Sequence, residues 1–266
     1  MVDSSNGAPL VADYAEWQAR DYYKTYYSEV VLPDEQAVLR YQLQVMAAAP
    51  ARFGRALEYG CGPTLHRAIA ATPYAFRLDM ADWLADNLVH VRDWLTAAPE
   101  NEDWSRFTRF IMAAEGHKRL EAARLRQREQ KTRKVVRGLY VSDARWRHPL
   151  GRDREGFYDL LVSGFCLDAI SSDKRVWRRC MRNVLSMVAP GGTVIVHFLH
   201  ECRAYKVGAR MFPGSNLSVD DVTGTFEDLG FARDTVDAQV IPCPDSAQYG
   251  YAGILTASAR RARLVD

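Results

Sequence analysis

Apolar and polar positions follow two different periodicities along the chain. Residues 13–49 repeat with a helical period that breaks at Pro33, where a proline and two acids open the run PDEQAVLRYQLQVM. Proline and acids are favoured in the first turn of a helix. From residue 53 onward, short strand-like runs alternate with helical ones. This alternation predicts an α/β fold with a mostly parallel sheet.

The individual elements follow from the same pattern. The predicted parallel strands are RALEYG, YAFRLDMAD, VVRGLYVSD, YDLLVSGF and GTVIVHFL. The predicted helices among them begin at Thr64 and include ADNLVHVRDWL and VWRRCMRNVLSMV. A further helix, SVDDVTGTFEDLG, precedes two strand-like runs, FARDTVDAQVI and YGYAGILTASARR, with no helix between them. These two runs predict an antiparallel C-terminal hairpin, which brings the sheet to seven strands.

Composition and charge are those of an ordinary globular protein. The 266 residues are 48% hydrophobic and 26% charged, and a formal net charge of +2 indicates neither a nucleic-acid nor a membrane partner. Five widely spaced cysteines without a C-x-x-C pair favour reduced thiols over disulfides or a zinc site. No signal peptide and no apolar run of about 18 residues is present. We therefore expect a cytoplasmic, metal-free protein that is a monomer or a weak homodimer.

Residues 117–137 are dense in lysine and arginine and allow two interpretations. The segment is either a nucleic-acid-binding helix or a solvated helix face. Glu121 and Glu129 lie within helical reach of its basic residues, and no aromatic residues are interleaved for stacking on bases. We favour the solvated face and expect no nucleic-acid partner.

The stretch EYGCGPT joins a predicted strand to a predicted helix. Glycines at such a junction let the backbone approach a ligand closely. Leu65 stands where the dinucleotide fingerprint needs its third glycine, and the lysine of a phosphate-binding loop is missing. An ordinary tight turn is therefore the alternative to a cofactor loop.

The ends of the following strands favour the cofactor loop. Asp82 ends the second strand twenty residues beyond Gly62, where an acid can accept hydrogen bonds from both hydroxyls of a ribose. Asp79 is the competing acid inside the same strand. The third and fourth strands end at Asp143 and Phe165, so polar or small groups gather where ligands of open α/β sheets bind.

These residues carry a family resemblance. The pieces RDYYKTYY, EYGCGPT, DWLADNL, VSD before HPLG, LVSGFCLDA, APGGTVIV and AYKVGARMF occur in order over nearly the whole chain. In them the sequence resembles class I S-adenosylmethionine-dependent methyltransferases of the group that includes nicotinamide, phenylethanolamine and indolethylamine N-methyltransferases. The resemblance implies a Rossmann-like sheet with helices on both faces, with residues 1–52 as a helical lid and residues 53–266 as the methyltransferase domain.

The resemblance also implies a binding site for S-adenosylmethionine. Asp82 would hold the ribose with support from Asn87, Trp83 would lie against the adenine, and Tyr22 and Tyr27 would close over the methionine carboxylate. A core-facing tyrosine stripe is the alternative reading of that last pair, because YYKTYY suits either role. The complete implied cofactor set is Tyr22, Tyr27, Gly60, Gly62, Thr64, Asp82, Trp83, Asn87, Asp143, Ala144 and Gly164.

The implied acceptor site lies between the ends of the fourth and fifth strands. The set expected to bind substrate is Tyr22, Phe165, Phe198, Tyr205 and Phe212. Phe198 stands where the nicotinamide enzyme has an acid, and Gly164 replaces a bulkier residue, which should enlarge the pocket. We therefore expect a small, largely apolar or aromatic acceptor, whose charge an aromatic wall could also bind.

The predicted function is N-methylation of a small amine or heterocycle, with catalysis mainly by proximity. No catalytic residue is certain, and the candidates are Tyr22, Asp168 and Tyr205. If a general base is needed, the sequence offers Asp168, His197, His200 and Glu201. The alternatives are intramolecular consumption of the cofactor or O- or C-methylation in specialised metabolism, and, further off, methylation of a nucleic acid.

Overall fold

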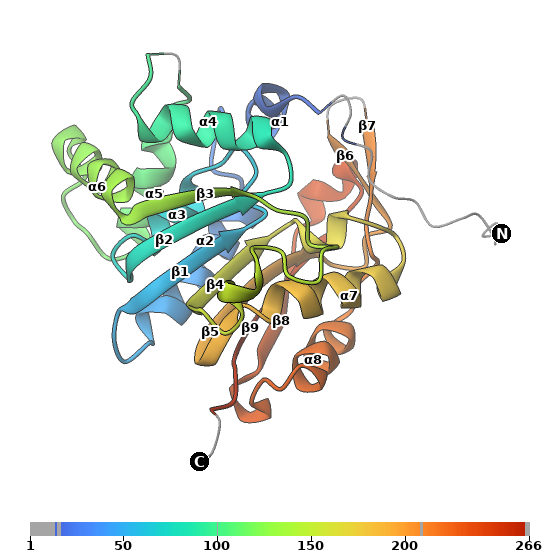
Figure 1. Cartoon of the computed structure of the whole chain (residues 1–266). Helices are drawn as coiled ribbons and strands as arrows, with labels where there is room; N and C mark the ends of the chain where they lie inside the picture. The colour runs from blue at the N-terminus through green and yellow to red at the C-terminus, as the bar shows by residue number, and fades with distance from the viewer. Residues whose placement is uncertain (1–13, 15–16, 100, 208–209, 264–266) are drawn as a thin grey trace.

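The structure, a computed structural model, describes residues 14, 17–99, 101–207 and 210–263. A seven-stranded sheet in the order β3-β2-β1-β4-β5-β9-β8 runs through it (Figure 1). The strands are β1 (Phe53–Tyr59), β2 (Ala75–Asp82), β3 (Val136–Val141), β4 (Tyr158–Gly164), β5 (Val188–Leu199), β8 (Asp237–Pro242) and β9 (Gly253–Arg260). The first five are parallel, and β9 is antiparallel to both β5 and β8. The predicted mostly parallel sheet with antiparallel C-terminal strands is confirmed.

Helices cover both faces of the sheet (Figure 1). The elements α2 (Pro33–Ala47), α3 (His66–Ala71), α4 (Ala85–Leu95), α5 (Ser105–Ala114) and α6 (Ala122–Val135) lie on one face, and α7 (Lys174–Leu185) and α8 (Val219–Asp228) lie on the other. Side chains of β5 alternate between these layers: Ile195 packs with the α2 layer, whereas Val196 and Phe198 pack with α7. Two large apolar cores result, one on each side of the sheet, and a smaller cluster that includes Val38 and Ile254 joins α2 to β9.

Two elements lie above the carboxyl ends of the strands. Helix α1 (Ala19–Tyr26) precedes the core helices, and a separate hairpin pairs β6 (Ala204–Val207) with β7 (Arg210–Pro213). The hydroxyl of Tyr26 donates a hydrogen bond to the carbonyl of Lys206 at 2.5 Å and so joins α1 to the hairpin. Figure 1 shows both elements at the same end of the sheet. The hydrophobic pattern predicts neither β6–β7 nor α5.

The link between β8 and β9 differs from the predicted hairpin in one respect. A 3₁₀ helix, Pro244–Tyr249, joins the strands where the pattern indicates no helix. Its side toward α2 supplies Ser246, whose hydroxyl donates to Asp34 at 3.2 Å. The link therefore fixes the start of α2 against the C-terminal strands.

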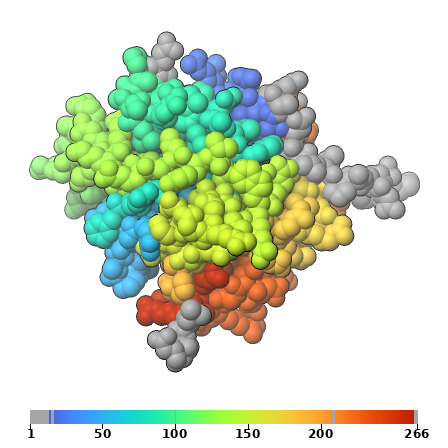
Figure 2. All heavy atoms as spheres, viewed as in Figure 1, coloured from blue at the N-terminus to red at the C-terminus, as the bar shows by residue number. Residues whose placement is uncertain are grey.

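The surface of the molecule, and the basic helix α6 in particular, can be compared with the partners expected from the sequence. The connection between β3 and β4, yellow-green in Figure 2, covers the centre of the face shown there. In α6, Arg124 and Lys131 are exposed while Leu125 and Thr132 are buried, which is the pattern of a helix with one solvated face. Within the described residues, no helix is long and apolar enough to cross a membrane.

Candidate functional site

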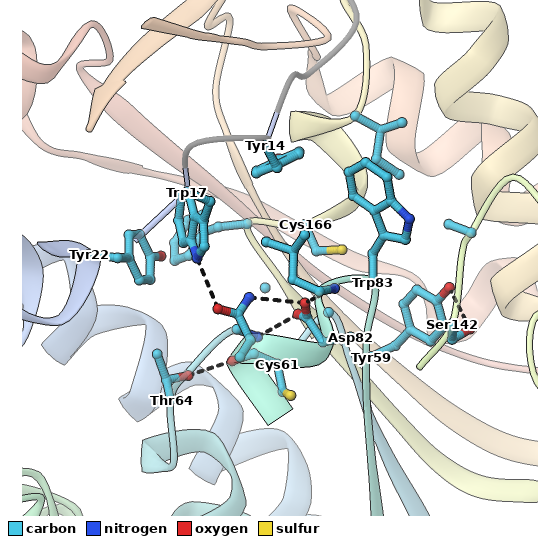
Figure 3. Close-up of a pocket in the computed structure, with 18 of the residues that line it drawn as sticks. Tyr14, Trp17, Tyr22, Tyr59, Cys61, Thr64, Asp82, Trp83, Ser142 and Cys166 are labelled. Carbon is cyan, nitrogen blue, oxygen red and sulfur yellow. Dashed lines mark hydrogen bonds between the residues drawn. The ribbon is translucent and has the colours of Figure 1, made fainter. Parts of the chain in front are cut away.

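Two adjoining cavities lie at the carboxyl ends of the parallel strands. The larger spans about 920 Å³, part of it open to solvent, and is called here the glycine-loop cavity, because the loop after β1 forms its floor (Figure 3). The ends of β2, β3 and β4 and the N-terminal segment complete its walls. The structure brings together in this lining all eleven residues that the resemblance implies for the cofactor: Tyr22, Tyr27, Gly60, Gly62, Thr64, Asp82, Trp83, Asn87, Asp143, Ala144 and Gly164.

The glycine loop has a conformation that requires glycine. Gly60 and Gly62 have φ angles of 70° and 59°, in the left-handed region that side chains with a Cβ rarely adopt. A Cβ on Gly60 would also overlap the Sγ of Cys166. The amide of Gly60 donates to the carbonyl of Ala81 at 2.7 Å, and the amide of Gly62 donates to Asp82 at 2.8 Å. The loop is therefore bonded to the end of β2, and no side chain of its glycines enters the cavity.

Asp82 connects the loop to the helices around it. Its Oδ2 accepts the bond from Gly62, and its Oδ1 accepts from the amide of Leu84 at 2.9 Å and from Nδ2 of Asn87 at 3.0 Å. The indole of Trp17 donates in turn to Oδ1 of Asn87 at 2.9 Å. Burial raises the pKa of Asp82, although these hydrogen bonds oppose the rise. Because a carboxylate has about four acceptor positions, three bonds leave one for a ligand hydroxyl.

The competing acid, Asp79, lies elsewhere. It is fully buried in β2, accepts a hydrogen bond from the hydroxyl of Tyr158 at 3.1 Å, and pairs with Arg77 at 3.2 Å. The bond from Tyr158 connects β4 to β2 across β1, and the pair with Arg77 lies within β2. Of the two acids, Asp82 is the one in the described lining of the cavity.

The glycine-loop cavity has an aromatic and charged wall where β2 and β3 end. Arg145 holds Asp143 with two bonds from its Nε at 2.9 Å and one from Nη2 at 2.6 Å. Burial would raise the pKa of Asp143, but Arg145 outweighs it and the pKa is lowered. The same guanidinium lies 5.1 Å from the ring of Trp83, and the ring of Tyr14 meets Trp83 edge-on at 5.4 Å. Trp83 keeps 42% of its surface exposed and offers a flat apolar face.

Gly164 does not enlarge the cavity as the sequence predicts. A Cβ at this position would lie 2.6 Å from Nε of Arg67. The side chain of Arg67 therefore fills the space that the glycine leaves, and its charged group lies 5.3 Å from the ring of Phe165. The absence of a side chain at position 164 makes room for this arginine and not for a larger ligand.

A second cavity of about 560 Å³, called here the tyrosine cavity, adjoins the first. The residues common to both linings are Tyr22, Tyr27, Phe165 and Tyr205. The tyrosine cavity also contains carboxylates of Asp34, Glu35 and Asp168. The expected aromatic wall is therefore present, but it is combined with acids from α2 that the sequence pattern did not point to.

Asp168 is the carboxylate with free capacity in the tyrosine cavity. It follows β4 in a 3₁₀ helix, Leu167–Ala169, and only 2% of it is exposed. Its Oδ2 accepts from the amide of Leu199 at 2.9 Å, while its Oδ1 has no partner among the described residues. Burial raises the pKa of Asp168 from 3.8 to about 7. Such a group can take up or release a proton near neutral pH.

The other predicted bases lie outside both cavities as described. His197 is fully buried, and its Nδ1 contacts the hydroxyl of Thr256 at 2.8 Å. Burial and the nearby Arg67 lower the pKa of His197 to about 3. His200 forms a β-bridge with Leu217, and Glu201 is exposed. Of the four candidates, Asp168 is the one that faces a described cavity.

Two of the predicted substrate residues are misplaced. Phe198 is wrong as a wall residue: it is fully buried against Trp177, with the rings 5.9 Å apart. The alternation along β5 directs position 198 into the α7 layer, away from both cavities. Phe212 lies behind the wall, where its ring stacks on Tyr205 at 5.7 Å and contacts Tyr14 at 5.3 Å.

Sequence reasoning missed several polar residues of the site, chief among them Arg67, Glu35 and Arg145. A usable signal existed for the first. The helix HRAIAA is apolar apart from His66 and Arg67, and an arginine within a short apolar helix is unusual enough to indicate a buried partner. No pattern in the sequence pointed to Glu35, because an acid in the first turn of a helix is explained by the helix dipole.

Comparison with known proteins identifies the family of the chain. Residues 10–262 match the model of the NNMT/PNMT/TEMT family. Indolethylamine N-methyltransferase of Mus musculus is 24% identical over 233 residues, which cover 86% of this chain and 84% of the relative. Nicotinamide N-methyltransferase of Homo sapiens is 26% identical over 175 residues, 66% of this chain and 65% of that protein.

A solved structure shows the same fold. The 1,6-didemethyltoxoflavin-N1-methyltransferase of Burkholderia thailandensis, solved with S-adenosylhomocysteine, superposes with a TM-score of 0.56 over 98% of both chains. Its sequence identity is 17%, so the likeness concerns the fold alone.

Proposed function

The chain belongs to the NNMT/PNMT/TEMT family, and on this premise we propose that it N-methylates a small aromatic amine. Membership makes the protein an S-adenosylmethionine-dependent methyltransferase. The choice of an amine as acceptor rests on one observation above all: Asp168, whose buried carboxylate has one oxygen without a partner among the described residues, lines an aromatic-walled cavity that adjoins the glycine-loop cavity.

The glycine-loop cavity fits S-adenosylmethionine. Asp82 has an acceptor position left for a ribose hydroxyl, and Trp83 offers a flat face to an adenine ring. Gly60 and Gly62 leave the floor free of side chains, so a ligand can lie directly on the backbone. Bound there, S-adenosylmethionine supplies an electrophilic methyl group to a nucleophile in the tyrosine cavity.

The tyrosine cavity suits an amine that carries an aromatic group and whose aliphatic nitrogen is protonated near neutral pH. Asp34, Glu35 and Asp168 place negative charge in its wall, and the rings of Tyr22 and Tyr205 present faces that attract a cation. A protonated amine has no lone pair and cannot attack the methyl group. Proton transfer from the ammonium to Oδ1 of Asp168 breaks an N–H bond, forms an O–H bond and leaves the nitrogen lone pair free.

The residues that line both cavities contribute mainly by orienting the reactants and excluding water. Tyr22, Tyr27, Phe165 and Tyr205 line both cavities, so they enclose the region through which the methyl group must pass. Exclusion of water protects the reactive pair. Well-oriented pairs reach effective molarities of about 10⁵ M or more, so positioning can supply a large part of the rate.

The test is a methyl-transfer assay with mass detection of products. The wild type, Asp168→Asn and the surface control Asp153→Asn are incubated with S-adenosylmethionine and a panel of aromatic amines, pyridines and phenols. We expect N-methylated amine and S-adenosylhomocysteine from the wild type and the control. Asp168→Asn should lose at least about tenfold in kcat/KM for amines that are protonated at the assay pH, and less for pyridines that are already neutral.

Other products would reject the proposal. Methylthioadenosine formed from the cofactor alone would indicate intramolecular consumption. Methylation confined to phenols would indicate an O-methyltransferase. If Asp168→Asn lost the same factor in kcat/KM for protonated and for neutral acceptors, Asp168 would not be the group that takes the proton.

A further inference from the structure

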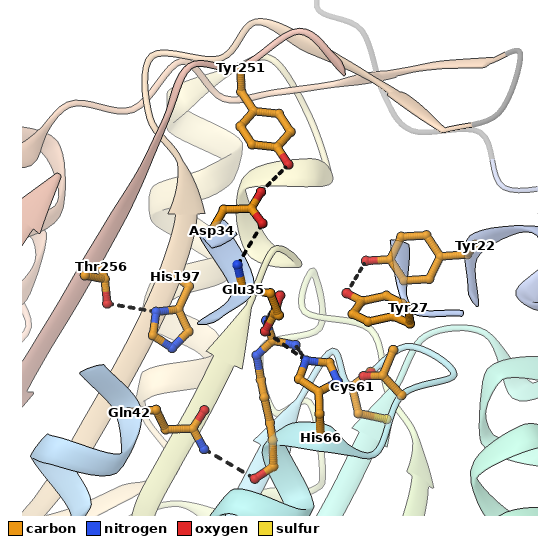
Figure 4. Close-up of polar contacts among 12 residues, drawn as sticks. Tyr22, Tyr27, Asp34, Glu35, Gln42, Cys61, His66, His197, Tyr251 and Thr256 are labelled. Carbon is orange, nitrogen blue, oxygen red and sulfur yellow. Dashed lines mark hydrogen bonds and ion pairs between the residues drawn. The ribbon is translucent and has the colours of Figure 1, made fainter. Parts of the chain in front are cut away.

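Arg67 is a buried cation between the two cavities that no step of the proposed reaction uses. It follows the glycine loop in α3, and 4% of it is exposed. Its Nη2 donates to the carboxylate of Glu35 at 3.0 Å and 3.3 Å, and its Nη1 lies 2.6 Å from Nε2 of His66. Figure 4 shows Glu35 and His66 close together within this group of polar side chains. Nε of Arg67 has no partner among the described residues.

The ion pair keeps Glu35 charged. Burial alone would raise the pKa of Glu35, but Arg67, together with His66, lowers it to about 2. Burial and the adjacent guanidinium lower the pKa of His66 to about 4, so the imidazole is neutral at pH 7. A guanidinium has five N–H donors. The contacts to Glu35 and His66 therefore do not exhaust the capacity of Arg67.

The location of Arg67 identifies the ligand group it faces. Two arginines occur in the described lining of the glycine-loop cavity, Arg67 and Arg145. Arg145 is held by Asp143 beside Trp83, at the adenine end. Arg67 is at the opposite end, against Gly164.

The tyrosines of α1 enclose the same end. The hydroxyls of Tyr22 and Tyr27 are hydrogen-bonded at 3.2 Å, and the ring of Tyr22 comes within 4.0 Å of the position that a Cβ on Gly62 would take. Burial raises the pKa of both tyrosines, and the nearby charge of Arg67 opposes the rise. The adenine and ribose are accounted for by Trp83 and Asp82, so the amino-acid part of the cofactor is left for this end.

We propose that Arg67, whose side chain fits here because position 164 is glycine, binds the α-carboxylate of the cofactor's methionine moiety. This inference rests on the proposed function only through the cofactor and does not depend on the acceptor. A carboxylate at this end would otherwise be buried among tyrosines and backbone. Arg67 is the permanent cation there, with a donor free, and charge-assisted hydrogen bonds are among the strongest that proteins form.

A pair of ligands isolates the carboxylate contact. S-adenosylhomocysteine carries the amino-acid part, whereas 5′-methylthioadenosine has the same nucleoside thioether without it. Calorimetry measures the dissociation constants of both for the wild type and Arg67→Gln. We expect Arg67→Gln to raise the dissociation constant of S-adenosylhomocysteine about ten- to a hundredfold, as loss of one hydrogen bond to a charged group does. The dissociation constant of 5′-methylthioadenosine should stay within about twofold of the wild-type value.

Matched variants separate binding from folding. Glu35→Gln removes the partner of Arg67 but keeps the guanidinium, so S-adenosylhomocysteine should bind as well as to the wild type or better. Gly164→Ala keeps Arg67 but places a methyl group against its Nε, so it should lose affinity for S-adenosylhomocysteine and keep its affinity for 5′-methylthioadenosine. Arg145→Gln, at the adenine end, should change the dissociation constants of both ligands by the same factor. Thermal unfolding of each variant shows which of them are folded.

The outcomes are distinct. Equal loss of both ligands in Arg67→Gln, or no loss, overturns the inference. The same selective loss in Glu35→Gln would also overturn it, because Arg67 would then act only through its ion pair. If the wild type binds 5′-methylthioadenosine and S-adenosylhomocysteine equally well, no carboxylate contact exists. If the wild type binds neither ligand, the proposed function itself fails.

Discussion

Asp168→Asn should make the protein more stable and less active at the same time. In the wild type, burial raises the pKa of Asp168 from 3.8 to about 7. The unfolded chain releases this proton at a lower pH than the folded chain does. Stability is therefore lost as pH rises from about 4 through about 7, and the loss is complete above pH 7.

The magnitude follows from the two pKa values. A pKa raised from 3.8 to about 7 corresponds to about 4 kcal/mol of destabilisation at pH 8 relative to pH 3. Asparagine carries no charge, so it escapes this penalty. Its side-chain oxygen can still accept the bond that Leu199 donates to Oδ2 of Asp168 at 2.9 Å, and its NH₂ group replaces the unpartnered oxygen. We expect Asp168→Asn to exceed the wild type by up to about 4 kcal/mol at pH 8.

The assay is urea unfolding of both proteins at several pH values between 4 and 8. The gap in unfolding free energy should be near zero at pH 4 and should widen as pH rises, because other groups titrate alike in the two proteins. A gap that does not depend on pH, or a variant less stable than the wild type at pH 8, would refute the reasoning. Either result would mean that Asp168 is solvated or paired in the folded protein.

Three further predictions address residues with different roles. Phe198→Ala should cost about 3–5 kcal/mol in urea unfolding, as a cavity in a core does, and should leave the KM for the acceptor unchanged; an altered KM would return Phe198 to the site. Asp82→Asn places an NH₂ group against a backbone or side-chain donor, so calorimetry should show at least about a tenfold loss of S-adenosylhomocysteine affinity, and unchanged affinity would contradict the role given to Asp82. Cys61→Ala should bind S-adenosylhomocysteine within about twofold of the wild type, whereas Gly62→Val, forced to a φ of 59°, should abolish binding; the reverse order would contradict the loop geometry.

The strands were predictable because apolar runs that alternate with helical ones are local signals of an α/β fold. Each predicted strand overlaps one in the structure, but the run FARDTVDAQVI begins with a 3₁₀ helix, Arg233–Thr235, and β8 starts only at Asp237. The elements that were missed lack such signals. The hairpin β6–β7 has four residues in each strand, too short for a clear alternation. Helix α5 has ten residues and directly precedes a basic segment, so its apolar positions do not form a clear helical repeat of their own.

The lining of the glycine-loop cavity was predictable in part for the same reason. Gly60, Gly62, Asp82 and Asp143 sit in the glycine loop or at strand ends, so their positions in space follow from the topology. Tyr22, Tyr27 and Asn87 lie on or beside helices, and only the family resemblance pointed to them. The tyrosine cavity instead combines α2, α1 and the segment after β4, which are distant in sequence. Phe198 illustrates the difference. The sequence places it correctly near the end of β5, but successive side chains of a strand point to opposite faces, and that of Phe198 points into the α7 layer.

The ion pair between Arg67 and Glu35 lies along the direction of the proposed reaction. Methyl transfer to a neutral amine moves one positive charge from the glycine-loop cavity into the tyrosine cavity. Arg67 lines the first cavity and Glu35 lines the second, with 3.0 Å between the charged groups. The negative end of the pair therefore faces the place where the charge arrives. Charges held in the fold need no reorganisation during the reaction, which is the condition under which electrostatic stabilisation is most effective. In the proposed reaction, the contacts that tie α3 to α2 and exclude a side chain at position 164 would therefore also contribute to the electric field between cofactor and acceptor.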